Sequence, residues 1–114
     1  MHVKRHPHAL LMVALLGAVT IGSYGHAEVP DAPRQADLKH LLKHDCGSCH
    51  GTRLSGGLGT PLTPEALANK PAEGLIATIL HGRPGSAMPP WQGLLSEDEA
   101  AWLVEQLQQG TALP

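Results

Sequence analysis

The sequence predicts a small all-α domain, and three observations lead to that prediction. Apolar residues recur in several segments at the three- and four-residue spacing of a helix. Glycine and proline are concentrated in two stretches between those segments, which are therefore predicted to be loops. No segment shows a convincing β-strand pattern. We expect three to four helices connected by two long ordered loops.

Residues 1–27 are predicted to be a cleaved signal peptide. Lys4 and Arg5 precede an uncharged apolar run at 9–21, which is shorter than the roughly 20 residues that cross a bilayer. Gly25 and Ala27 are the small residues that a signal peptidase requires. Cleavage after Ala27 leaves one domain, 28–114, with no stable membrane anchor. The alternative is an uncleaved N-terminal anchor.

The predicted domain is acidic and poor in aromatic residues. Six Lys and Arg against ten Asp and Glu give residues 28–114 a formal charge of −4, which argues against nucleic-acid binding. The domain contains no Phe or Tyr, and its aromatic residues are Trp91 and Trp102. So short a chain with so few large side chains buries little apolar area by itself. We therefore expect another group to complete the core.

The first helix is expected from Arg34 to about Asp45. Leu38, Leu41 and Leu42 fall at i, i+3 and i+4 within it, on one face. An irregular loop at 55–62 follows, because it contains three glycines and a proline.

Two short helices are expected next. Thr63 and Pro64 begin one that runs to about Ala68, since proline suits the first helical position. Pro71 begins another, and Gly82 ends it. Its inward-facing residues are expected to be Leu75, Ile76, Ile79 and Leu80.

A second loop and a last helix complete the chain. Residues 83–91 contain three prolines and are therefore expected to form neither helix nor central strand. Ser96 and Glu99 form a capping box that begins the final helix. Gly110 is expected to end it. Its buried face is expected to consist of Ala100, Leu103, Val104 and Leu107.

The motif C-G-S-C-H contains the two cysteines of the chain, Cys46 and Cys49, followed by His50. A structural zinc site normally needs four ligands, and no second cysteine pair is present. A thioredoxin-like site needs a βαβ setting, whereas here a helix is expected before the pair and a loop after it. The pattern C-x-x-C-H in an exported chain is typical of covalent haem attachment. Each thiol would add to one haem vinyl group.

A covalent haem needs axial ligands for its iron, and the sequence offers several. His50, next to the second cysteine, is the candidate proximal ligand. Met88 is the candidate sixth ligand, because a loop stiffened by prolines holds it in place with little loss of entropy on folding. His81 is the rival for that position, and His40 and His44 are weaker rivals.

These motifs together resemble a family. C-G-S-C-H-G, M-P-P-W and L-S-E-D-E before a final helix resemble a class I monohaem cytochrome c, over residues 37–109. The residue sequences of both loops resemble one type within this family more closely. That type is the small periplasmic cytochrome associated with dissimilatory nitrite reductase (NirC type). The resemblance implies a small cytochrome c fold wrapped around one covalently bound haem c.

The resemblance also implies roles for single residues. His50 would be the proximal and Met88 the distal iron ligand. A proline carbonyl would accept the proximal histidine N–H; Pro61 is the matching candidate, and its neighbours are not excluded. Arg83 and Trp91 would meet the haem propionates, with a solvated charge and loop packing as the respective alternatives.

One departure from the family concerns the final helix. Gln106 stands where related helices often have an aromatic residue, and Trp102, one turn earlier, is expected to pack on the first helix instead.

Iron held on both sides has no open position for a substrate, so we expect an electron carrier and not an enzyme. The carrier would be a periplasmic monomer that serves denitrification. Its partners would be redox proteins, either nitrite reductase or the proteins that complete the specialised haem of that enzyme. The alternatives are a haem-based sensor or small haem enzyme in which Met88 dissociates, and a haem-free thiol or zinc module.

Overall fold

The computed structural model describes residues 28–114, and the predicted signal peptide at 1–27 lies outside the described residues. The described part is all-helical, as predicted, with four helical runs. The first run consists of α1 (Ala32–Leu41), η1 (Leu42–Cys46) and α2 (Gly47–His50) without interruption. The other three runs are α3 (Pro64–Leu67), α4 (Ala72–His81) and α5 (Glu97–Gln109). No helix within 28–114 is long and apolar enough to span a membrane.

Both ends of the first helical run follow from local chemistry. The Asp31 side chain accepts a hydrogen bond from the Arg34 N–H at 2.9 Å and caps α1, and a proline occupies its first turn. Gly51 ends α2 with φ at 88°. A Cβ at Gly51 would lie 2.7 Å from the Gly56 carbonyl oxygen. Only glycine therefore allows the chain to turn back so closely.

The shorter helices begin and end at the predicted residues. The Thr63 hydroxyl accepts a hydrogen bond from the Ala66 N–H at 3.3 Å and caps α3. Pro71 precedes α4, and Gly82 follows it with φ at 68°. Both loops predicted between helices, 55–62 and 83–91, contain no helix or strand.

The predicted capping box begins α5. The Glu99 N–H donates to Ser96 Oγ at 3.1 Å, and the Ser96 N–H donates to Glu99 Oε2 at 2.9 Å. At the other end, Gly110 adopts the left-handed conformation with φ at 73°, which is typical of the residue that ends a helix.

An ion pair connects the beginnings of the first and last helices. Arg34 Nε lies 2.6 Å from Glu99 Oε1. The Arg34 guanidinium also donates to the Leu94 carbonyl at 3.3 Å. Since Glu99 is a member of the capping box as well, one carboxylate fixes the start of α5 and joins it to α1.

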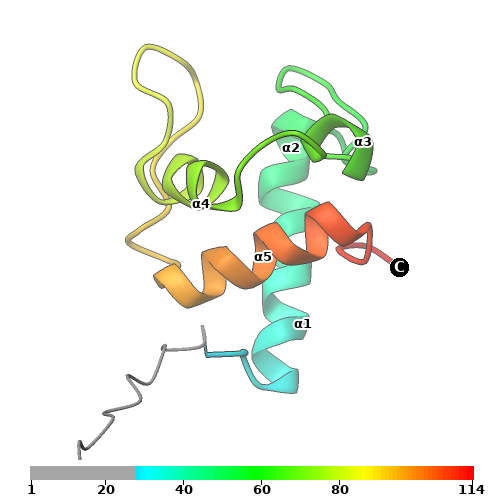
Figure 1. Ribbon diagram of the computed structural model, residues 1–114, viewed down its shortest axis with the longest axis vertical. Helices are drawn as coiled ribbons and strands as arrows, with labels where there is room; N and C mark the ends of the chain where they lie inside the picture. Colours follow the sequence, from blue (N-terminus) through cyan, green and yellow to red (C-terminus); the bar gives the residue numbers. More distant parts are fainter. Residues whose placement is uncertain (1–27) are drawn as a thin grey trace, which may run out of the picture.

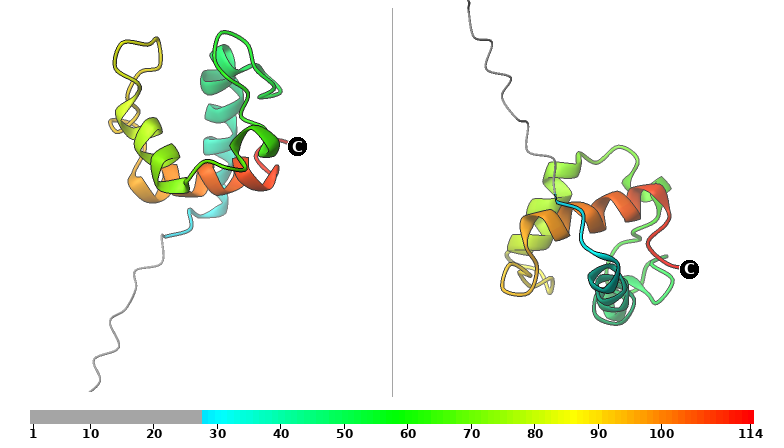
Figure 2. Two further views of the ribbon diagram at one scale, coloured as in Figure 1. Left: turned by 45° about the horizontal axis from the view of Figure 1, so that its top comes forward. Right: turned by 90° about the horizontal axis from the view of Figure 1, so that it is seen from below.

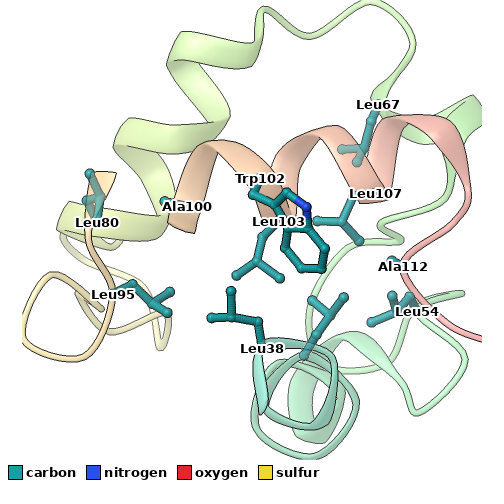
Figure 3. Close-up of a cluster of buried hydrophobic side chains, with 11 residues drawn as sticks. Leu38, Leu54, Leu67, Leu80, Leu95, Ala100, Trp102, Leu103, Leu107 and Ala112 are labelled. Atoms are coloured by element: carbon teal, nitrogen blue, oxygen red, sulfur yellow. The ribbon is translucent and has the colours of Figure 1, made fainter. Parts of the chain in front are cut away.

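The hydrophobic core is small (Figure 3). Its largest fully buried side chains are Leu38, Leu42, Leu103 and Val104. Trp102 is buried in the same part of the molecule, within the cluster that also contains Leu38. Gln106 is half-buried, and its carbonyl and amide oxygens accept hydrogen bonds from Thr111. Leucines thus form most of the core, as the shortage of aromatic residues predicts.

Helix α5 is the base on which the other elements are arranged. It crosses the first helical run, and both α3 and α4 pack against it (Figure 1). Seen after a 45° turn, the elements rise from α5 as two walls (Figure 2, left). The end of the first run and the loop after it form one wall. Helix α4 and the loop after it form the other.

Candidate cofactor site

A cavity of about 730 Å³ lies between the two walls. Its volume is within the range of about 300–1,000 Å³ that is usual for ligand pockets. Its base includes buried side chains of the core, among them Leu103 and Val104. The seven residues that were assigned to the site from the sequence, apart from the rival ligands, all line this one cavity. They are Cys46, Cys49, His50, Pro61, Arg83, Met88 and Trp91.

The C-x-x-C-H motif lies inside a helix, which corrects the expectation that the helix ends near Asp45. The Gly47 N–H bonds to the Leu42 carbonyl, five residues back, so the chain makes a π-helical turn and then continues as α2. Ser48 Oγ donates a hydrogen bond to the Asp45 carbonyl oxygen at 2.7 Å, so this carbonyl has a partner where η1 meets α2. The helix stops only at Gly51, where φ is positive.

This helical continuation decides where the motif side chains point. Cys46, Cys49 and His50 stand at i, i+3 and i+4, which is one face of a helix. All three line the cavity. The π-helical turn ends at Cys46, the first residue of this face, and such turns occur frequently at functional sites.

Both cysteines are free thiols. Burial of the Cys46 thiol, and after it the neighbouring Asp45 carboxylate, raise the pKa of this thiol to about 11. A redox-active cysteine needs the opposite, a lowered pKa that favours the thiolate. Within residues 28–114, no group of three or more His, Cys, Asp or Glu side chains is arranged to hold a metal ion by itself. The geometry therefore favours neither the thiol nor the zinc interpretation.

The imidazole of His50 is fixed by the loop that follows the motif. Its Nδ1 lies 2.7 Å from the Thr60 carbonyl oxygen. A carbonyl only accepts, so Nδ1 carries the proton, and Nε2 keeps its lone pair for a ligand bond. The ring also lies against Gly59, where a Cβ would come within 2.8 Å of Nδ1.

The acceptor is the carbonyl of Thr60, a neighbour of the matching candidate Pro61. The loop is tied to the helix just before this point, because the Gly59 N–H donates to the Cys49 carbonyl at 2.7 Å. Pro61 restricts the preceding residue to an extended conformation. The Thr60 carbonyl is thus the one that meets the ring, while Pro61 lines the cavity.

Met88 lies on the opposite wall, half-buried and lining the cavity. The Arg83 N–H donates to the Met88 carbonyl at 3.2 Å, and the Met88 N–H donates to Ser86 Oγ at 3.3 Å. Gly82 approaches the same carbonyl so closely that a Cβ there would lie 2.7 Å from its oxygen. These contacts hold the methionine backbone in one position.

The rival iron ligands lie elsewhere. His81 ends α4 with an exposed side chain and does not line the cavity. His40 and His44 are exposed on the first helical run and do not line it either. The sulfur-bearing side chain that lines the wall opposite His50 is that of Met88.

Arg83 and Trp91 border the cavity on the side of Met88. The Trp91 N–H donates to the Ile79 carbonyl at 3.0 Å, which joins the loop to α4. Its indole is half-buried, whereas Arg83 is exposed. Trp91 thus has a packing role as well as a place at the site.

Gly59 was not expected at the site, and the carbonyl of Thr60 was left open only as a neighbour of Pro61. The sequence contains no signal for a backbone carbonyl's direction, because that depends on how the loop closes. The common direction of Cys46, Cys49 and His50 was not predicted either, because it depends on the helix continuing through the motif.

Comparison with known proteins adds independent observations. A family model described as cytochrome c oxidase, cbb3-type, subunit III matches residues 33–106. Cytochrome c55X of Pseudomonas aeruginosa is 66% identical over 87 residues, covering 76% of this chain and 73% of that protein. Cytochrome c55X of Stutzerimonas stutzeri is 52% identical over 114 residues, the full length of both chains.

Two solved structures are also similar. The c-type cytochrome NirC superposes with a TM-score of 0.73 at 65% identity, over 75% of this chain and all of that one. The dihydro-heme d1 dehydrogenase NirN, in complex with DHE, superposes with a TM-score of 0.58 at 36% identity. That match covers 67% of this chain but 16% of the longer NirN chain. A domain of this kind is thus similar to one part of a larger protein.

Proposed function

The chain belongs to the cytochrome c55X (NirC-type) family of c-type cytochromes, and from this we propose that it carries single electrons by means of one covalently bound haem c. The observation that carries the proposal is the lining of the cavity, where two thiols and an imidazole on one wall lie opposite a thioether on the other. Covalent haem uses two thiols, and axial ligation of its iron uses the other two groups.

The cavity suits a large, mostly apolar disc. Leu42, Leu75 and Leu103 are among the apolar side chains that line it. Cys46 and Cys49, on one helical face, would form the two thioether bonds. The small core supports this assignment, because burying such a disc supplies the apolar contact that the side chains lack.

His50 and Met88 would bind the iron from opposite sides. The hydrogen bond from His50 Nδ1 to Thr60 leaves Nε2 available and holds the ring in one orientation. The hydrogen bonds of Met88 in its loop hold the thioether on the other wall. When bound, the haem would supply a one-electron Fe(III)/Fe(II) couple, with a potential raised by the methionine ligand.

With both axial positions filled by side chains, no position remains for a substrate, which favours electron transfer over catalysis. Arg83 would pair with a haem propionate, and Trp91 would donate its indole N–H to one. Both roles are supported by the position of these residues on the cavity wall beside Met88. Pro61 would contribute packing contacts there.

The physiological setting follows from the relatives. We place the mature chain, residues 28–114, in the periplasm after removal of a signal peptide at 1–27. Two relatives carry the names NirC and dihydro-heme d1 dehydrogenase NirN, which supports a role in denitrification. The partners would be dissimilatory nitrite reductase or the proteins that complete its specialised haem.

The function is tested with protein exported by a host that attaches haem to C-x-x-C-H motifs. The reduced cytochrome is mixed with purified nitrite reductase or with a haem-maturation protein, and its reoxidation is timed by absorbance. Rapid reoxidation by one of them supports the carrier function. A ferric protein that is high-spin, or a reduced protein that binds CO tightly, would support a sensor or haem enzyme with a dissociable Met88 instead.

A further inference from the structure

Two histidines outside the cavity form a close pair. His40 in α1 and His44 in η1 are both exposed, and neither lines the cavity. Their ring centroids are 4.3 Å apart, and the ring planes are tilted by 39°. None of the hydrogen bonds within residues 28–114 involves either ring. The electron-carrier function uses neither side chain.

The spacing of the pair has a chemical consequence. Histidines at i and i+4 stand on one face of a helix and bind a single metal ion together, as in helical zinc sites. Zinc–nitrogen bonds are about 2.0–2.1 Å long, so two imidazoles on one ion must each bring a ring nitrogen to within about 4 Å of the other. With their ring centroids 4.3 Å apart, His40 and His44 are close enough to share an ion after side-chain rotation.

We propose that His40 and His44 together form a surface site for one divalent transition-metal ion of the class that prefers imidazole, namely Zn²⁺, Ni²⁺ or Cu²⁺. The pair supplies two ligands, since no third His, Cys, Asp or Glu joins it within 28–114. Water completes the coordination. The ion binds more weakly than in a four-ligand structural site.

The charges around the pair are mixed. Lys39 and Lys43 share its helix and oppose a dication, although the Lys39 ammonium donates to the Thr111 carbonyl at 3.3 Å. Asp37 precedes His40 by three residues and is exposed, so its carboxylate partly offsets the lysines. Because these charges largely offset one another, they add little to the affinity for a metal ion. The affinity comes from the two imidazole ligands.

The site is independent of the haem. Because neither histidine lines the cavity, an ion bound there displaces nothing from it. Metal binding would also brace the junction between α1 and η1, because one ion would bridge a residue on each side of it.

Isothermal titration calorimetry tests the proposal. Ferric holoprotein without a polyhistidine tag is titrated with Zn²⁺ in a non-coordinating buffer. We expect saturable binding of one ion per chain. The variants His40→Gln and His44→Gln should each lower the affinity by about tenfold or more, since the loss of a group that only orients a ligand already costs a metal site that much. The double variant should show no saturable binding, because both ligands are removed. His81→Gln, another exposed helical histidine, should bind as the wild type does. Mg²⁺, which prefers oxygen ligands, should not bind.

Two results would overturn the proposal. One is an absence of saturable Zn²⁺ binding to the wild type. The other is an affinity that stays the same in His40→Gln and His44→Gln, which would mean that an adventitious ion is bound elsewhere. Circular dichroism and the haem spectrum of each variant verify that the fold and the cofactor site are intact, so neither result depends on the haem assignment.

Discussion

The Nδ1 atom of His50 lies 2.7 Å from the carbonyl oxygen of Thr60. This hydrogen bond connects the helix that carries both cysteines to the loop that turns back over it. It sets the tautomer and the plane of the ring, which are the two properties that a histidine ligand to iron needs fixed. The tightness of this loop leads to the first prediction.

Gly59→Ala should disturb the His50 ring. The added Cβ would lie 2.8 Å from Nδ1 and 2.9 Å from Cε1, so the ring or the loop must move. Overpacking of this kind costs about 1–3 kcal/mol. We expect a lower free energy of unfolding in urea and a changed reduction potential. Gly93→Ala is the matched control, because its Cβ would meet nothing within 4 Å. Equal potentials in both variants would contradict the role of Gly59 in positioning the ring.

Met88→Ala should remove the sixth ligand and leave the haem attached. The potential should fall, because the thioether that favours Fe(II) is lost, and the reduced protein should bind CO. Voltammetry and the optical spectrum measure both effects. His81→Ala is the control, since that side chain is exposed away from the cavity. An unchanged potential and spin state in Met88→Ala would contradict the assignment of Met88 as the sixth ligand.

Replacing both Cys46 and Cys49 by Ser should prevent attachment and leave the chain largely unfolded. The reason is the small leucine core, whose cavity would then lack its occupant. Far-UV circular dichroism and thermal scans measure the outcome. A cooperative unfolding transition in the haem-free double variant would show that the core is sufficient alone.

The capping box makes part of the stability depend on pH. Two hydrogen bonds hold the pKa of Glu99 below its usual value. The larger effect comes from the Arg34 side chain and the smaller one from the Ser96 N–H. This carboxylate therefore stabilises the fold above its unfolded-state pKa of about 4.3, and its contribution disappears as the pH falls through the lower folded-state value. Glu99→Gln should be less stable than the wild type at pH 7, and the difference should shrink in acid. Urea unfolding at pH 7 and in acid measures this difference in the free energy of unfolding. A difference that stays constant between these pH values would contradict the stabilising role of the Glu99 carboxylate.

Ser96→Ala tests the other half of the capping box. The Ser96 hydroxyl accepts a hydrogen bond from the Glu99 N–H at 3.1 Å, and loss of such a cap costs about 1 kcal/mol. We expect a lower urea midpoint with an unchanged slope. Ser55→Ala, in an exposed loop position, is the control. Equal midpoints for the two variants would mean that the cap contributes nothing measurable.

The helix boundaries were largely predictable because their signals are local. The capping box at Ser96, Pro64 in the first turn of α3, and Gly82 and Gly110 after their helices each act through neighbouring atoms. The first helix was the exception. It was expected to end near Asp45, yet the π-helical turn at Leu42–Cys46 continues the helix through to His50.

The membership of the site was also predictable, but its detailed contacts were not. Covalent chemistry and ligand type identified Cys46, Cys49, His50 and Met88 from the sequence, and the structure brings them to one cavity. The acceptor for His50 depends on the closure of the loop from Gly51 to Leu62, which involves hydrogen bonds between backbone groups of any residue type. A sequence does not show which backbone groups form such bonds, so the acceptor was expected only as the carbonyl of Pro61 or of a neighbour, and it is that of Thr60.

The central claim is that this chain holds a haem through thioether bonds from Cys46 and Cys49. A pyridine haemochrome spectrum of the exported, purified protein, recorded after acid–acetone extraction, tests it most directly. The account predicts that the haem stays with the polypeptide and gives the spectrum of a thioether-linked haem. A folded protein that contains no haem, or that loses it to the solvent, would contradict the account.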